Sequence, residues 1–220
     1  MRTAKVLKMI NDNRIDELKK LLEDDIYQES LKTKPNAKKR YTAMKKYFTY
    51  HKSVRECLQK PYPVTFEDRD YISFCNSWSL ALTTEDIGEI EMYDEINGKY
   101  PDVTRLLRFD GIKKKINFGE VFAEARSKGY RLNKSEVDAG FKYLMLYDGT
   151  YYKVGLIEAT FGIIDDGEMA MTYHPDGERM PLTIQTSLGI AMIMPVKYEG
   201  DPEEDGKIVI EVGWEEMKGE

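Results

Sequence analysis

Apolar residues recur at helical spacing in two stretches near the start of the chain. In residues 12–26 they fall three or four positions apart, on one face of a helix: Ile15, Leu18, Leu22 and Ile26. Asp12 precedes this stripe and is a residue type that caps helix N-termini. A second helix is predicted over residues 37–58, with apolar positions at Tyr41, Met44, Phe48, Cys57 and Leu58. Pro61 and Pro63 end this helix, because proline removes a backbone donor and restricts the residue before it.

Beyond Pro63 the pattern changes to short apolar runs separated by turn residues. These runs predict strands over residues 70–74, 79–83, 87–96, 141–147, 151–154, 168–173, 182–185 and 189–195. The pair Asp148-Gly149 separates two of them and is a strong hairpin signal. Further helices are predicted over residues 118–127, capped by Asn117, and over residues 155–164. The pattern predicts an α+β fold in which a helix-plus-strands unit of roughly 80 residues occurs twice.

The same elements predict three parts along the chain. Residues 1–34 form an N-terminal helical extension, residues 35–198 form one domain, and residues 199–220 form an acidic tail. The tail holds nine acidic residues against Lys207 and Lys218, and its residues 208–212 are apolar enough to add one strand.

Charge is distributed unevenly along the 220 residues, although the net charge is only −6. Residues 32–60 hold ten basic residues and one acidic residue, whereas residues 61–220 hold 17 basic and 31 acidic residues. This asymmetry indicates one basic surface on an acidic body. Two cysteines, Cys57 and Cys75, do not support a disulfide framework or a zinc ribbon, and they favour a reducing cytoplasm. No run approaches the roughly 18 apolar residues of a membrane span, and the start lacks the apolar region of a secretory signal.

Three segments, taken in order, resemble a domain of the bacterial-type DNA polymerase sliding clamp. The strongest is Tyr152–Lys197, which closes with an apolar strand running into Met-Pro and a hydrophobic-basic pair: Ala191-Met192-Ile193-Met194-Pro195-Val196-Lys197. Leu80–Asp86 is similar to a strand-end Thr-Asp turn of a clamp domain, and Lys99–Leu107 is similar to the Tyr/Phe-Pro-Asp tract between clamp domains. The resemblance covers residues 37–197. It implies a domain of two helix-plus-strands repeats, six of which close a ring around duplex DNA with helices inside and sheets outside.

The basic segment is the candidate DNA-binding surface. Lysine and arginine neutralise phosphates and release counterions, which gives sequence-independent binding to duplex DNA. By the resemblance, the inward-facing cations are Lys38, Lys39, Lys45, Lys46, Lys52 and Arg55, joined by Arg126 and Lys128 near the 118–127 helix. A solvated helix face is the alternative. The interleaved aromatic residues fit base stacking less well than core packing: Tyr41, Tyr47, Phe48 and Tyr50. The cluster Lys113–Lys115 is either a further phosphate contact or a strand edge.

The resembled clamps also hold a hydrophobic groove that accepts short peptides from polymerases and repair factors. The matching residues here are Leu156, Leu188, Met194, Pro195 and Val196. Methionine suits an adaptable apolar pocket. The alternative is that these residues complete a buried strand.

Enzymatic chemistry has little support in the sequence. His51 and His174 are the only histidines, and neither lies in a ligand or base motif. A Cys75–His174 dyad is one hypothesis for a hydrolase, against the more common buried strand cysteine. The acidic cluster Glu85, Asp86, Glu89 and Glu91 lacks the spacing of a calcium loop, and no phosphate-binding or nucleophile-elbow motif occurs. The sequence therefore predicts no catalytic residue, no metal and no cofactor.

Two functions from different classes follow. The first is a non-enzymatic, cytoplasmic DNA-associated clamp-like protein that binds duplex DNA and peptide motifs of replication proteins. Because the chain holds one such domain and a clamp subunit holds three, a ring would require a homo-oligomer of six copies. The alternative is a monomeric interaction module or clamp mimic, of the kind carried by mobile elements, that does not encircle DNA. Neither hypothesis involves a membrane.

Overall fold

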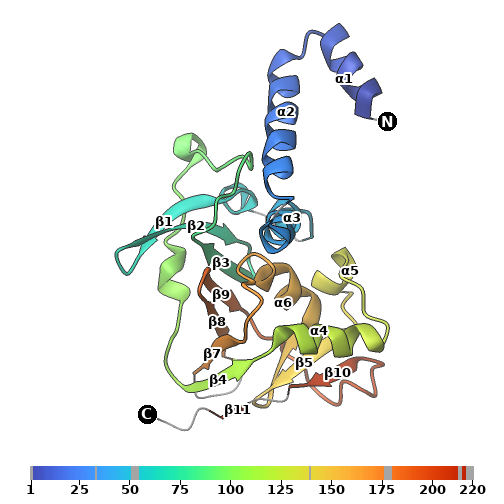
Figure 1. The fold of residues 1–220 in the computed structure, drawn as a ribbon. Helices are drawn as coiled ribbons and strands as arrows, with labels where there is room; N and C mark the ends of the chain where they lie inside the picture. The colour runs from blue at the N-terminus through green and yellow to red at the C-terminus, as the bar shows by residue number, and fades with distance from the viewer. Residues whose placement is uncertain are drawn as a thin grey trace.

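A computed structural model describes residues 2–32, 34–50, 55–138, 140–175, 180–212 and 215–216. Its helices and strands form an α+β fold, as the sequence predicts. Two N-terminal helices, α1 (Arg2–Asn11) and α2 (Ile15–Ser30), stand away from the rest of the chain (Figure 1). The helix predicted over residues 12–26 is present as α2. Asp12 is not its cap, because Asn13 has a φ of 55° and α2 begins only at Ile15.

The largest element is an eight-stranded sheet whose neighbouring strands are all antiparallel. Its order is β1 (Tyr62–Phe66), β2 (Arg69–Cys75), β3 (Ser79–Thr83), β9 (Gly189–Ile193), β8 (Leu182–Thr186), β7 (Ala170–His174), β4 (Ile112–Ile116) and β11 (Glu215–Glu216). The central strands β3 and β9 are buried along their whole length, which explains the continuous apolar sequence of β9 and the apolar centre of β3.

Two similar units make up most of this sheet. In one, α3 (Pro35–Tyr50) precedes β1, β2 and β3; in the other, α6 (Val154–Phe161) precedes β7, β8 and β9. The units meet where β3 pairs with β9, with Ala81 opposite Ala191, and α3 packs against α6 (Figure 1). The helix-plus-strands duplication is therefore present. Its two copies lie farther apart along the chain than the predicted repeat length, since β3 begins at Ser79 and β9 begins at Gly189.

The main hydrophobic core lies between the sheet and the helices. Tyr47 of α3, Phe74 of β2 and Ile157 of α6 belong to it, and α4 (Phe118–Ser127) adds Phe118 and Phe122. The predicted cap of α4 is confirmed, because the Asn117 side chain accepts a hydrogen bond from the Glu120 amide.

A second apolar cluster covers the opposite face of β2, β3 and β9. Residues 84–111 cross this face as a long connection with two short 3₁₀ helices, η2 (Glu95–Asn97) and η3 (Val103–Leu106), and η1 (Glu56–Gln59) adds Leu58. Tyr100, Val103 and Leu107 pack there. The predicted strand over residues 87–96 is wrong. The backbone instead turns at Gly88, whose φ is 54° and whose amide donates to the Asp86 side chain.

A smaller sheet of three strands lies beside α4. β5 (Tyr143–Tyr147) and β6 (Thr150–Lys153) form the predicted hairpin, with positive φ at both Asp148 and Gly149 as a type I′ turn requires. β10 (Ile208–Glu211) pairs in parallel with β5, so the acidic C-terminal stretch is joined to the body by this strand and by β11. The short helix α5 (Lys134–Val137) precedes this hairpin. Within the described ranges, no helix combines the length and apolar character that crossing a membrane requires.

Candidate functional site

The exposed side of α3 carries the predicted basic residues. Tyr41, Met44 and Tyr47 turn into the core, because residues three or four positions apart share one face of a helix. The opposite side therefore exposes lysine side chains: Lys38, Lys39, Lys45 and Lys46. The interpretation of the aromatic residues as core is confirmed, since Phe48 and Tyr50 also pack against the main core.

Four of the eight predicted cations have acidic partners within the described part of the chain. Lys39 lies 2.6 Å from the Asp165 carboxylate, and Lys45 lies 2.8 Å from Asp24. The two cations near α4 are also paired, Arg126 with Glu158 and Lys128 with Glu124. The acids come from three parts of the chain: α2, α4, and α6 with the turn that follows it. Binding of phosphate at these positions would therefore compete with existing ion pairs.

Two lysines of α3 differ from the others. Lys38 and Lys46 are exposed, and neither forms an ion pair with any residue that the structure describes. Arg55 is exposed immediately before η1, and Lys52 lies outside the described residues. Lys38 and Lys46 are therefore the described lysines of this helix that could meet a phosphate without breaking an internal ion pair.

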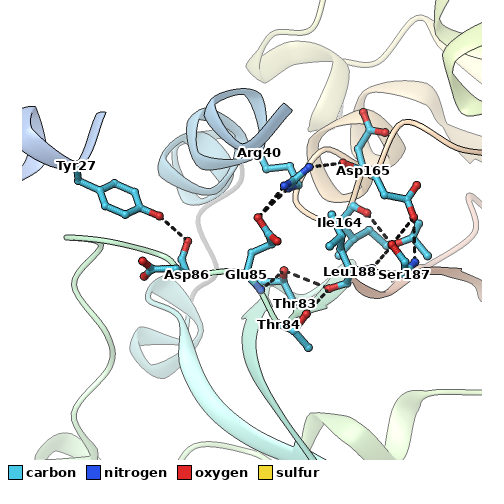
Figure 2. Close-up of polar contacts among 12 residues, drawn as sticks. Tyr27, Arg40, Thr83, Thr84, Glu85, Asp86, Ile164, Asp165, Ser187 and Leu188 are labelled. Atoms are coloured by element: carbon cyan, nitrogen blue, oxygen red, sulfur yellow. Dashed lines mark hydrogen bonds and ion pairs between the residues drawn. The ribbon is translucent and has the colours of Figure 1, made fainter. Parts of the chain in front are cut away.

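Arg40 connects α3 to both halves of the sheet (Figure 2). Its side chain is 10% exposed and donates to the Glu85 carboxylate at 2.7 and 3.2 Å. A third hydrogen bond reaches the backbone oxygen of Asp165 at 3.0 Å. Because Glu85 follows β3 and Asp165 follows α6, one guanidinium holds together the two similar units. Its planar set of donors suits this bridging role.

The end of β3 meets the start of β9 directly below Arg40. The Leu188 carbonyl accepts hydrogen bonds from the Thr84 amide at 3.1 Å and from the hydroxyl groups of Thr83 and Thr84 (Figure 2). Asp166 accepts from the Ser187 amide and hydroxyl at 3.0 and 2.8 Å. Burial alone would raise the pKa of Asp166, but these hydrogen bonds outweigh it and lower the pKa.

The predicted peptide-binding residues fall in three different places. Met194, Pro195 and Val196 follow β9 and are half-buried, whereas Leu156 is a residue of α6 that is buried in the main core. Leu188 lies in the turn before β9, at the opposite end of that strand. A strand of five residues spans roughly 17 Å, so Leu188 and Met194–Val196 do not share one groove.

An exposed tryptophan lies beside Met194 and was not predicted as part of a site. The Met194 amide donates to the Trp78 carbonyl at 2.9 Å, and the Trp78 side chain is exposed. The Lys153 ammonium lies 5.7 Å from the Trp78 ring centre, and burial lowers the pKa of this lysine. The sequence signal that could have identified this exposed tryptophan is its position in the tight turn after Asn76, because an aromatic residue in such a turn is readily left in solvent.

A cavity of about 400 Å³ lies between α3, α4 and α6. Its apolar wall includes Phe122, Leu132 and Phe161, and its polar wall includes Lys46. Three of the predicted DNA-binding residues line it: Lys39, Lys46 and Arg126. The structure therefore brings cations from α3 and α4 to the same hollow surface, together with the acids that pair with two of them.

The hypothesis of a catalytic cysteine does not fit the geometry. Cys75 is 3% exposed, and burial raises the pKa of its thiol to about 12, so the thiol stays protonated near neutral pH. His174 ends β7, which lies four strands from β2 in the sheet, a separation of roughly 19 Å. Among the described residues, no group of three or more histidine, cysteine or acidic side chains is arranged to hold a metal ion.

Comparisons with known proteins give no relative. No protein-family model, no curated protein and no solved structure matches the chain.

Proposed function

We propose that this chain is a DNA-associated, non-enzymatic clamp-like factor that contacts duplex DNA through the exposed face of α3 and acts in the cytoplasm. The observation that carries the proposal is the paired arrangement of two helix-plus-three-strand units, with both helices on one face of the sheet. This is the architecture expected of a domain that places helices toward DNA and strands away from it. The sequence resemblance over residues 37–197 supports the same function.

The electrostatic contribution comes mainly from α3. Lys38 and Lys46 supply two positive charges that form no ion pair with the described part of the chain, and Lys39 and Lys45 supply two more whose ion pairs are solvent-exposed on the lysine side. Phosphates that contact Lys39 or Lys45 compete with the largely buried carboxylates of Asp165 and Asp24, so these two lysines contribute less than Lys38 and Lys46. Binding of this kind is independent of sequence and falls steeply with salt.

A second surface, formed by Trp78 and Met194–Val196, is proposed to bind short apolar peptides of polymerases or other replication proteins. Trp78 is exposed and Met194 is half-buried beside it. Tryptophan is among the residue types most often found at energetic centres of protein interfaces, and methionine adapts its shape to different partners. This surface replaces the larger set that included Leu156 and Leu188.

The DNA proposal is tested by the salt dependence of binding to a labelled duplex, followed by fluorescence anisotropy. Replacing Lys38 and Lys46 with alanine removes two phosphate contacts, and the slope of log K against log salt should fall by about 2. The matched control is Lys99→Ala with Arg105→Ala, which removes two charges from the connection covering the opposite face of the sheet. An unchanged slope in the Lys38 and Lys46 variant would remove α3 from the DNA surface.

A second candidate function is a monomeric interaction module or clamp mimic that does not encircle DNA. The observation that favours it is the internal neutralisation of Lys39, Lys45, Arg126 and Lys128 by acidic side chains. A ring of one-domain chains requires six copies of a 25.6 kDa chain, but salt-dependent binding to duplex DNA separates the two functions whatever the number of copies. An absence of salt-dependent binding to duplex DNA would favour the interaction module.

A further inference from the structure

Exposed apolar side chains concentrate in the first two helices. Ten large apolar residues are exposed among the residues that the structure describes, and five of them lie before residue 27: Leu7, Ile10, Ile15, Leu22 and Ile26. Ile26 is 71% exposed. Single exposed apolar residues are normal on a protein surface, but a cluster on one element marks an interaction site.

These residues recur at helical spacing on each helix of the hairpin formed by α1 and α2. On α2 the apolar positions Ile15, Leu18, Leu22 and Ile26 are spaced three or four residues apart, and on α1 Leu7 and Ile10 have the same spacing. Among the side chains described between residues 6 and 30, only Met9 is buried. An amphipathic helix is normally stabilised by packing its apolar face against another element. Within the single chain, these two helices leave most of that face in water.

The last turns of α2 attach the hairpin to the body. The Asp24 carboxylate accepts hydrogen bonds from Tyr41 at 2.6 Å and from Lys45 at 2.8 Å, and the Tyr27 hydroxyl donates to the Asp86 carbonyl at 3.1 Å. The rest of the hairpin projects away from the sheet (Figure 1). Its apolar stripe is therefore accessible to another molecule along most of its length.

The two helices of the hairpin carry opposite net charges. Residues 2–11 hold three basic and no acidic residues, whereas residues 15–30 hold six acidic and two basic residues. A twofold-symmetric pair of chains places the same surface on both sides of the interface, so α1 of each copy can lie on α2 of the other. Each acidic helix then meets a basic helix, and the apolar stripes meet between them as in a four-helix bundle.

We propose that α1 and α2 form a dimerisation hairpin, in which the apolar stripe and opposite charges of one copy pack against those of a second copy of this chain. Other occupants fit less well. The net negative charge of α2 repels nucleic-acid phosphates, and helices that lie on anionic membranes carry a basic polar face. The dimer is independent of the proposed DNA binding, because its residues precede α3.

Sedimentation equilibrium of the full chain, from about 1 to about 200 µM, tests the proposal. The measured mass is expected to approach twice that of the single chain as the protein concentration rises. Leu22→Glu with Ile26→Glu should raise the dimer dissociation constant by roughly 100-fold, since each charge would be buried in the apolar seam. Both positions are exposed in the single chain, so circular dichroism of the variant should match that of the unaltered protein.

The matched control places the same two charges at exposed apolar residues elsewhere. Ile96 is 84% exposed and Leu106 is also exposed, and both lie in the connection between β3 and β4. Ile96→Glu with Leu106→Glu should leave the dissociation constant unchanged. The mass of a single chain at every concentration, or equal weakening by both double variants, would overturn the proposal.

The pairing of α1 with α2 has its own test. Lys5→Glu with Lys8→Glu makes α1 acidic, so it would face the acidic α2 of the partner copy. The dissociation constant should then rise at least tenfold at low salt, and the difference should shrink as salt screens the charges. An unchanged dissociation constant at low salt would overturn this arrangement of the helices. DNA affinity, measured separately, distinguishes this failure from failure of the proposed function.

Discussion

Replacing Arg40 tests whether its bridge holds the two similar units together. Arg40→Leu removes two hydrogen bonds to Glu85, at 2.7 and 3.2 Å, and one to the Asp165 carbonyl at 3.0 Å. The Glu85 carboxylate is then left without its cation in a site where its side chain is 27% exposed. Breaking a fully buried pair costs about 3–5 kcal/mol, and partial access to water places this case near the lower end, about 3 kcal/mol.

The pairwise contribution can be isolated with a double-mutant cycle. Glu85→Gln keeps the shape of the side chain and removes its charge, so it should lower the free energy of unfolding by about 1 kcal/mol. If the two groups interact as the distances indicate, the double variant should lose about 1–2 kcal/mol less than the sum of the single variants. Urea unfolding followed by circular dichroism measures each value, provided that the m-value is constant.

The neighbouring residue Lys39 supplies the control. It occupies the same helix and pairs with Asp165, but its side chain is 69% exposed. Lys39→Leu should therefore change the free energy of unfolding by less than about 1 kcal/mol. Additive losses for Arg40→Leu and Glu85→Gln, or an equal loss for Lys39→Leu, would refute the reasoning.

Three further predictions concern separate parts of the fold. Thr160→Val keeps the shape of the side chain but removes the 2.9 Å hydrogen bond to the buried Ser79 hydroxyl, so thermal or urea unfolding should show a loss of about 1 kcal/mol. Burial raises the pKa of Asp24, but hydrogen bonds from a lysine and a tyrosine of α3 outweigh it and lower the pKa below 3.8. A carboxyl with a lowered folded-state pKa stabilises the protein above its unfolded pKa, and this contribution is lost as pH falls below about 4. Asp24→Asn should therefore flatten the acid limb of a plot of stability against pH, and an unaltered limb would contradict this. At Gly189 a Cβ atom would lie 2.0 Å from the Leu82 carbonyl oxygen, so Gly189→Ala should cost about 3 kcal/mol or more, and a loss below about 1 kcal/mol would contradict the observed pairing of β3 with β9.

The fold class follows from local patterns, but the long-range pairing does not. The hairpin at Asp148-Gly149 and the cap at Asn117 are confirmed, because each depends on a few neighbouring residues. The strand predicted over residues 87–96 is wrong, because its apolar residues belong to a loop that packs onto the sheet. Hydrophobic periodicity does not distinguish such a loop from a strand. The pairing of β3 with β9 joins residues as distant in the chain as Ala81 and Ala191, and no local signal specifies it.

In the candidate site, too, local sequence predicts some features and long-range contacts decide the others. The sequence identifies the exposed lysines of α3, since helical spacing decides which side chains face outward. It does not identify their partners: Lys39 pairs with an acid 126 residues later, and Lys45 pairs with one 21 residues earlier. The surface at Trp78 and Met194 likewise depends on the neighbouring positions of β3 and β9 in the sheet.

The central position of β9 also constrains how the chain folds during synthesis. β1, β2 and β3 can pair as soon as they are made, but β3 then has an open edge and remains without the strand that covers it. Because β9 is made roughly 110 residues after β3, a ribosome adding about 5–20 residues per second exposes this apolar edge for roughly 5–20 s. An uncovered strand that is buried along its whole length in the finished fold is a template for pairing with other chains, so the nascent protein should depend on chaperones during this interval.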